Sequence, residues 1–248
     1  MSEDKYFKFY NAVLVVPLIA VLTIWLVFWL ELSLQVNWNF LGIFPRTLSG
    51  LKGVVFSPLI HSSVEHLYNN TIPVAILLGA LVYFYQDIYG KVLIWGILIS
   101  GIVTWIIGRP SYHIGISGLI YVLASFIFFK GIFTKHYRLV ALSLVVVFIY
   151  GGLLWYIFPI EDGISWEGHL GGFTAGLLMA LMIKVKTPPV KKYEWEQEDF
   201  NEQDDPFLRH FDADGNFVEN NEEQSHTEEA SVKITYHFKK SLPEEGKD

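Results

Sequence analysis

Six long runs of apolar residues, separated by shorter polar segments, occupy the first three quarters of the chain. They lie near 12–32, 64–86, 91–108, 116–134, 137–158 and 167–185. A bilayer core about 30 Å thick is crossed by a helix of roughly 20 predominantly apolar residues. The pattern therefore predicts an all-α, polytopic membrane protein in which residues 1–186 form a bundle of six transmembrane helices.

The first apolar run could instead be the core of a signal peptide, because Lys5 and Lys8 precede it. Such cores are roughly 7 to 15 residues long. The stretch AVLVVPLIAVLTIWLVFWL is longer, and no small-x-small cleavage site follows it. We therefore expect a retained first transmembrane helix.

Charge divides the chain into two segments. Residues 1–186 contain 11 Lys or Arg and 8 Asp or Glu, a formal charge of +3, whereas residues 187–248 contain 7 and 17, a formal charge of −10. The hydrophobic content of 52% exceeds the roughly 45 to 50% of soluble domains, and the first segment accounts for the excess. The chain has no cysteine, which excludes disulfides and thiolate catalysis.

The segment 187–248 is predicted to be a cytoplasmic acidic tail. It is highly charged and poor in aliphatic residues, a composition that favours disorder. One stretch, SVKITYHFK at 231–239, alternates apolar and polar residues and predicts a short strand. Because a lone strand is unstable, we expect this one to pair with a cytosolic partner or to fray.

The distribution of Lys and Arg predicts the orientation in the membrane. With the N-terminus inside, ten of these residues lie on the inner side and three, Arg46, Lys52 and Arg109, lie on the outer side. Both termini are therefore expected to be cytoplasmic. The long outer connection near 33–63 carries aromatic residues suited to the headgroup region.

Four polar residues inside the predicted spans lie at a similar depth. In this topology the second, fourth and sixth spans all run inward from the outer face. His66 and Asn70 lie in the first turns of the second span, Ser117 begins the fourth, and His169 lies in the first turns of the sixth. A polar group within a span is costly unless it has a partner, so all four are candidate functional residues.

Helical spacing indicates that Ser117 and His169 can meet. Ser117 and Tyr121 share one face of the fourth span. His169 shares a stripe with Gly172 and Gly176, a small-xxx-small pair that lets membrane helices approach closely. Close packing of these two spans would bring the imidazole to the hydroxyl, which is the minimal nucleophile and base of acyl-transfer chemistry.

The same region offers hydrogen-bond donors for an oxyanion. His66 and Asn70, one turn apart, can present an imidazole N–H and an amide, and the backbone N–H of Ser117 at a helix start supplies a third donor. Gly115 and Gly118 remove side-chain bulk beside the serine. Loop backbone and substrate can therefore approach the hydroxyl.

Three strings in the chain resemble the signatures of the rhomboid intramembrane serine proteases. HSSVEHLYNN matches H-x-x-x-x-H-x-x-x-N, GISGLIY matches G-x-S-G, and GHLGGFTAG matches H-x-x-G-x-x-x-G. The matching residues are His61, His66, Asn70, Gly115, Ser117, Gly118, His169, Gly172 and Gly176. The resemblance covers roughly residues 10–186. One departure is the segment LKGVVFSP, where many members carry a Trp-Arg pair.

The resemblance implies roles for five of these positions. Ser117 and His169 would form a catalytic dyad without an acidic third member, His66 and Asn70 would stabilise the oxyanion, and Tyr121 would pack on the dyad histidine. The implied activity is cleavage of single-span membrane proteins near the outer membrane face, in a bacterial plasma membrane. No metal, other cofactor or nucleic acid is expected.

Other functions remain open from the sequence. A rhomboid-like pseudoprotease would bind or escort membrane proteins without cleaving them, but would lack the serine or the histidine. A transporter or proton relay could also place His and Asn within spans, although paired broken helices are not evident. A zinc site built from His61, His66 and His169 is disfavoured because no H-E-x-x-H motif is present. We expect His61 to support the outer loop and assign no role to His113.

Overall fold

The computed structural model describes residues 7–161, 163–186, 193–201, 204–212 and 214–218. The chain divides into two compact units, Met1–Val190 and Lys191–Asp248, which are treated separately below. The described part of the first unit contains helices and no strand. The strand predicted at 231–239 lies outside the described residues.

The described part of the first unit contains seven α-helices. They are α1 (Ala12–Leu34), α2 (Gly53–Phe56), α3 (Val64–Phe84), α4 (Tyr89–Ile107), α5 (Ser117–Thr134), α6 (Tyr137–Tyr150) and α7 (Trp166–Met182). Four of these, together with α6 and its 3-10 continuation η5 (Gly151–Ile157), give five helices long and apolar enough to cross a membrane. The predicted all-α, multi-pass membrane bundle is confirmed.

The helix at the predicted sixth span is shorter than the others. Helix α7 has 17 residues, so it rises about 26 Å. It begins after the N-cap Ser165, whose side chain accepts a hydrogen bond from the Gly168 backbone N–H, and it ends at Met182. It is not among the five helices long and apolar enough to cross a membrane in the described residues, so the count of six spans stays a prediction.

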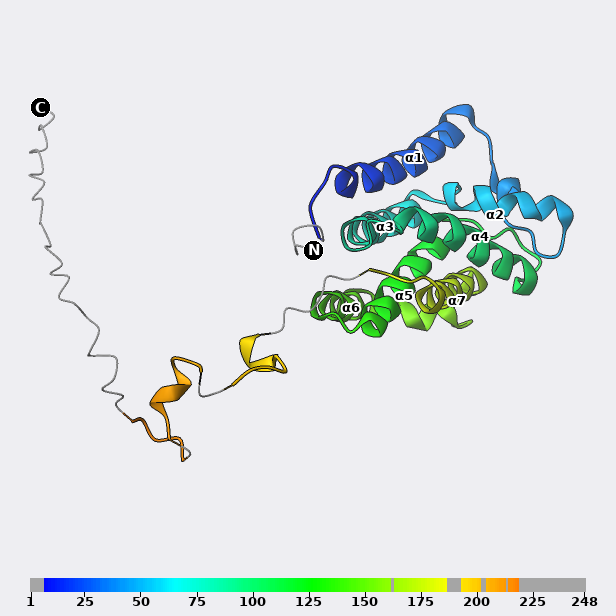
Figure 1. Ribbon diagram of the computed structural model, residues 1–248. Helices are drawn as coiled ribbons and strands as arrows, with labels where there is room; N and C mark the ends of the chain where they lie inside the picture. The colour runs from blue at the N-terminus through cyan, green and yellow to red at the C-terminus, as the bar shows by residue number, and fades with distance from the viewer. Residues whose placement is uncertain (1–6, 162, 187–192, 202–203, 213, 219–248) are drawn as a thin grey trace, which may run out of the picture. The chain divides into compact units, whose positions relative to one another are not determined.

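Helix α5 lies at the centre of the bundle (Figure 1). It packs against α3, α4, α6 and α7, and the side chains of Val122, Leu123, Phe126 and Ile127 are fully buried there. Helix α7 packs on both α4 and α5, whereas α1 packs on α3 at the edge of the bundle. The two helices that begin near the predicted dyad are thus neighbours along much of their length.

Two glycines allow α7 to lie directly on α5. A Cβ atom added at Gly172 would fall on the carbonyl oxygen of Gly118, and one added at Gly176 would fall on that of Val122. Both acceptor atoms belong to the backbone of α5, which cannot move aside as a flexible side chain can. The small-xxx-small stripe therefore sets the separation of the two helices.

The outer connection between α1 and α3 folds into short helical turns. These are η2 (Asn39–Leu41), η3 (Leu48–Lys52), α2 and η4 (Ser57–Leu59). The Arg46 guanidinium donates to the carbonyls of Ile106 and Gly108 at 3.1 and 2.8 Å. Ile43 and His113 exchange two backbone hydrogen bonds of 2.9 Å. The connection is therefore fastened to the loop between α4 and α5.

The described part of the second unit contains two short 3-10 helices, η6 (Glu194–Glu196) and η7 (Leu208–His210). After η7 the Asp212 carboxylate accepts hydrogen bonds from the backbone N–H groups of Asp214 and Asn216, at 3.0 and 2.8 Å. Aspartate favours such local bonds to the backbone, and they form a turn here. An isolated bridge joins Phe211 to Phe217 across it.

Candidate active site

Ser117 and His169, 52 residues apart in sequence, form a hydrogen bond in the first unit. The Ser117 hydroxyl oxygen lies 3.0 Å from Nε2 of His169. Nδ1 of the same ring lies 3.0 Å from the Tyr156 carbonyl oxygen. Since a carbonyl can only accept, Nδ1 carries the proton. In the neutral ring Nε2 is then the acceptor for the serine O–H, which is the tautomer that a general base requires.

The 3-10 turn η5 supplies the carbonyl acceptors that orient His169 and the Tyr121 ring beside it. Helix α6 ends at Tyr150, and the chain continues as η5 from Gly151 to Ile157. Two carbonyls of η5, beyond the end of α6, act as acceptors: that of Tyr156 accepts from His169, and that of Leu153 accepts from the Tyr121 hydroxyl at 2.7 Å. The Tyr121 ring stacks on the His169 ring, with centroids 4.3 Å apart and planes 13° apart.

The start of each helix positions its histidine. Ser63 is the N-cap of α3, and its hydroxyl accepts from the His66 backbone N–H at 3.1 Å. Ser165 caps α7 in the same way, and His169 lies in the first turns after it. Serine is a favoured N-cap because its oxygen satisfies an otherwise unpaired N–H group. Both imidazoles are thereby held close to helix starts.

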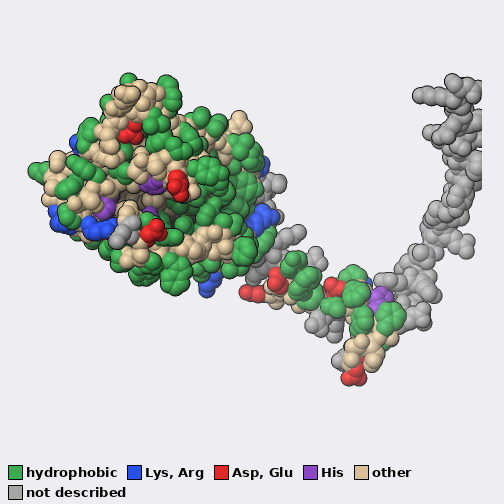
Figure 2. Space-filling view, turned by 180° about the vertical axis from the view of Figure 1, so that it is seen from behind, with side chains coloured by type: hydrophobic (Ala, Val, Ile, Leu, Met, Phe, Trp, Pro, Cys, Tyr) green, Lys and Arg blue, Asp and Glu red, His purple; other side chains and the backbone are tan. Residues whose placement is uncertain are grey.

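A cleft of about 720 Å³ contains the residues predicted for the site. It is lined among others by His66, Asn70, Ser117, Tyr121 and His169. Figure 2 shows one face of this unit, on which histidine and acidic side chains gather among hydrophobic and neutral ones. The cleft is large enough for an extended segment of polypeptide beside the serine.

Asn70 and His66 present two candidate donors for an oxyanion in the cleft. The Asn70 side chain is 6% exposed, and its Nδ2 has no hydrogen-bond partner among the described residues. Nδ1 of His66 lies 3.3 Å from the Ser62 hydroxyl. If that hydroxyl donates to Nδ1, Nε2–H of His66 is left to donate elsewhere. A buried amide without a partner is costly, and a substrate oxygen would satisfy it.

Gly115 lies directly against the two oxyanion candidates. Its φ is +103°, a backbone conformation that favours glycine. An added Cβ would lie 2.9 Å from His66 Nε2 and 3.8 Å from Asn70 Nδ2. At Gly118 the nearest atom would be the Gly168 carbonyl oxygen at 3.5 Å, an ordinary contact. The two glycines beside Ser117 are thus constrained differently.

We expect Gly115→Ala to lower the free energy of unfolding by about 1 to 3 kcal/mol, because alanine is strained at this φ and presses on His66. Gly118→Ala is the matched control and should unfold at or slightly above the wild-type temperature. Thermal unfolding of both variants in detergent checks this. Equal loss of stability in the two would contradict the assignment.

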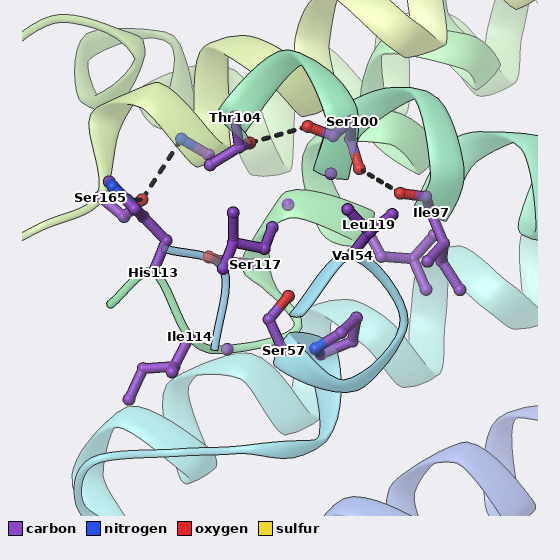
Figure 3. Close-up of a pocket in the computed structure, with 16 residues that line it drawn as sticks. Val54, Ser57, Ile97, Ser100, Thr104, His113, Ile114, Ser117, Leu119 and Ser165 are labelled. Atoms are coloured by element: carbon purple, nitrogen blue, oxygen red, sulfur yellow. Dashed lines mark hydrogen bonds between the residues drawn. The ribbon is translucent and has the colours of Figure 1, made fainter. Parts of the chain in front are cut away.

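A second, smaller cavity also borders Ser117. Its volume is about 30 Å³, and its polar lining includes Ser57, Ser100, Thr104, His113 and Ser165. In Figure 3 His113 and Ser165 lie next to each other beside Ser117. Nδ1 of His113 lies 2.6 Å from the Ser165 hydroxyl. No role was predicted for His113, since a loop histidine has no periodicity to indicate what it faces.

His61 supports the start of α5 from the outer connection. It is 3% exposed, and its Nε2 lies 3.5 Å from the backbone N–H of Ile116, the residue before Ser117. Burial lowers the pKa of His61 to about 4, and the neighbouring His66 ring adds to the effect. Burial also lowers the pKa of His113. Both rings are therefore neutral near pH 7.

Stability is expected to fall with acidification because of His61. Above pH 6.5 its ring is neutral in both states, so its full contribution is present. Between pH 6.5 and about 4 the unfolded state binds a proton that the folded state does not, which costs up to roughly 3 kcal/mol. We expect His61→Gln, which keeps an acceptor but cannot titrate, to flatten this slope in unfolding measured from pH 7 to 4. A slope unchanged by the substitution would contradict the assignment.

The structure brings Ser117, His169, His66, Asn70 and Tyr121 together in one cleft, whereas Gly172 and Gly176 lie where α7 packs on α5. Among the described residues it contains no group of three or more His, Cys, Asp or Glu that could hold a metal ion. The ion pair between Arg109 and Glu167 was not predicted, because the two residues are 58 positions apart and follow no common motif. The arrangement as a whole is a serine and a histidine in hydrogen-bond contact within a helical membrane bundle.

Comparison with known proteins identifies the family. A model described as "Rhomboid domain" matches residues 49–186, more than half of the chain. The chain therefore belongs to the rhomboid family. The fold, the signature strings and the contact between serine and histidine agree with this assignment.

The curated relatives carry no functional description. An uncharacterized protein of Mycobacterium tuberculosis (strain ATCC 25618 / H37Rv) is 37% identical over 155 residues, which cover 58% of this chain and 64% of the relative. An uncharacterized protein of Mycobacterium bovis matches with the same values. One of Mycobacterium leprae is 34% identical over 146 residues, covering 54% of this chain and 57% of the relative. The match thus spans less than two thirds of each relative.

Proposed function

We propose that the protein is an intramembrane serine endopeptidase in which Ser117 is the nucleophile and His169 its general base. The observation that supports this most directly is the 3.0 Å contact between the serine oxygen and Nε2 of His169, with the Nδ1 proton held by the Tyr156 carbonyl. The serine attacks the scissile carbonyl carbon while its proton passes to Nε2. The resulting imidazolium later gives that proton to the leaving amine, and an acyl-enzyme remains.

The negative charge that develops on the carbonyl oxygen would be stabilised by donors in the same cleft. Asn70 Nδ2, with no partner among the described residues, is the first of these, and Nε2–H of His66 is the second. The backbone N–H of Ser117, at the first residue of α5, is the third. Each such donor typically contributes about 10²- to 10³-fold in rate.

Hydrolysis of the acyl-enzyme repeats these steps with water as the nucleophile. His169 takes a proton from water and returns one to the departing Ser117 oxygen. The Tyr121 ring, stacked at 4.3 Å, keeps the imidazole plane fixed through both halves of the reaction. No acidic residue is needed, since the Tyr156 carbonyl sets the tautomer.

The proposed substrates are single-span membrane proteins, which are cut near the outer membrane face where the helix can unwind. The substrate class is the one that the resemblance to rhomboid proteases implies. The outer-face position of the cut is supported by the dyad near the starts of α5 and α7 and by the Lys and Arg distribution, which favours both termini in the cytoplasm. The membrane would be a bacterial plasma membrane. Residues 187–248 would form a cytoplasmic tail outside the chemistry, with 231–239 available to a cytosolic partner.

Cleavage of a single-span model substrate by the purified protein in proteoliposomes tests this proposal. We expect a cut on the outer side of the substrate span, mapped by mass spectrometry of both fragments. A pseudoprotease that escorts membrane proteins would bind the same substrate and leave it intact. An epitope placed after Asp248 and digested only from the outer side of right-side-out vesicles would contradict the orientation.

A further inference from the structure

The described residues contain a buried carboxylate that the proposed chemistry does not use. Glu167 lies in the first turn of α7, two residues before His169, and its side chain is fully buried. Its Oε1 accepts hydrogen bonds from Arg109, at 3.0 Å from the backbone N–H and 2.8 Å from Nε. A buried charge is costly unless it is paired, so the fold tolerates this one only with Arg109 in place.

Arg109 contacts the start of α7 at a second point. Its Nη2 donates to the Ile164 carbonyl at 2.7 Å, just before the N-cap of the helix. Arg109 itself stands in the loop that leads from α4 to Ser117. A planar guanidinium with several fixed donors can bind two acceptors at once, which an ammonium cannot do with the same geometry. The loop before the serine is thereby joined to the turn before the histidine.

His113 makes a parallel connection between the same two segments. Nε2 of its ring lies 3.1 Å from the Arg109 carbonyl, so this nitrogen carries the proton. Nδ1 then accepts from the Ser165 hydroxyl at 2.6 Å, and the oxygen of that hydroxyl accepts from the Gly168 N–H at 3.3 Å. The N-cap of α7 is thus attached to the loop that carries Arg109.

We propose that Arg109 and Glu167 are positioning residues that hold the His169 imidazole in line with the Ser117 hydroxyl. This inference rests on the proposed function. Neither side chain lines the cleft, so neither contacts the substrate, and both act through the segments that carry the dyad. The glycine contacts set the separation of α5 and α7, whereas this ion pair fixes the start of α7 against the loop before α5.

The far end of α7 provides a matched control. The Lys130 side chain on α5 is buried, and its Nζ donates to the Ala180 carbonyl at 2.9 Å. This contact also joins α7 to a neighbouring segment through a buried charge, but 11 residues, or about 16 Å, from His169. Loss of this contact should weaken the bundle without moving the imidazole.

The test compares Arg109→Ala, Glu167→Gln and the double variant with Lys130→Met, all as full-length protein in detergent. For the first three we expect kcat to fall about 10- to 100-fold with KM changed less than about threefold, as small displacements of catalytic groups do. The rate of fluorophosphonate labelling should fall in parallel, and the double variant should be no worse than the poorer single variant. Lys130→Met should unfold at a lower temperature with kcat per folded molecule unchanged.

The outcomes separate this inference from the proposed function. If the wild-type protein neither cleaves nor labels, the proposed function fails. If the wild type is active and the folded variants at 109 and 167 match it in kcat and labelling rate, only the positioning role is wrong. Arg109→Ala could fail to fold because Glu167 is left buried without its cation. In that case the double variant, in which a neutral glutamine replaces the carboxylate, decides the question by kcat and labelling rate.

Discussion

Ser117→Ala and His169→Ala should each reduce cleavage of a model membrane substrate by roughly 10⁴- to 10⁶-fold while leaving the protein folded. The reason is the shared hydrogen bond between the two side chains, since neither can perform the proton transfer without the other. The double variant should be no slower than either single one. Single-turnover cleavage assays, with helix content and unfolding temperature measured on the same samples, check this prediction.

Substantial proteolysis by purified Ser117→Ala would remove the proposed nucleophile. A fully additive double variant would also contradict the account, because residues that act as one unit do not lose activity independently. A matched control is Ser125→Ala on the same helix, whose hydroxyl donates to the Phe173 carbonyl at 2.7 Å and has no part in the proposed chemistry. We expect it to retain wild-type turnover per folded molecule.

Asn70→Ala and Gly172→Val should separate loss of catalysis from loss of packing. Asn70→Ala removes a donor with no partner among the described residues, so turnover should fall about 10²- to 10³-fold with little change in unfolding temperature. Gly172→Val places a branched side chain on the Gly118 carbonyl, and overpacking of this kind typically costs about 1 to 3 kcal/mol. Its unfolding temperature and its activity should fall together.

The two variants are informative as a pair. If Asn70→Ala unfolded as early as Gly172→Val yet kept normal turnover per folded molecule, Asn70 would be a packing residue and the oxyanion would need another donor. If Gly172→Val kept the wild-type unfolding temperature, the backbone contact between α7 and α5 would be less close than the structure indicates. Thermal unfolding followed by fluorescence, combined with initial rates, distinguishes these results.

The contact between Ser117 and His169 could be predicted from the sequence, because the residue pattern indicates both the helical periodicity and the direction of each span. The apolar runs set the depth of each polar residue, and the glycines at 172 and 176 indicated which face of the sixth run meets the fourth. The position of His66 and Asn70 in the first turns of the second span followed from the same pattern. The family signatures at 61–70, 115–121 and 168–176 pointed to the same residues.

Other parts of the site depend on groups that the sequence does not mark. The carbonyls of Leu153 and Tyr156 orient Tyr121 and His169, but every residue has a carbonyl, so the sequence does not mark these two. Arg109 and Glu167 are distant in sequence and belong to no periodic stripe. Their pairing results from how the loop before α5 folds onto α7.

The measurement that tests the central claim most directly is fluorophosphonate labelling of the detergent-solubilised full-length protein, with the modified residue located by mass spectrometry. The account predicts one labelled residue, Ser117, and no labelling in His169→Ala, because an isolated serine hydroxyl is a weak nucleophile without its base. A wild-type protein that remains unlabelled, or one that is labelled at another serine while Ser117 stays unmodified, would contradict it.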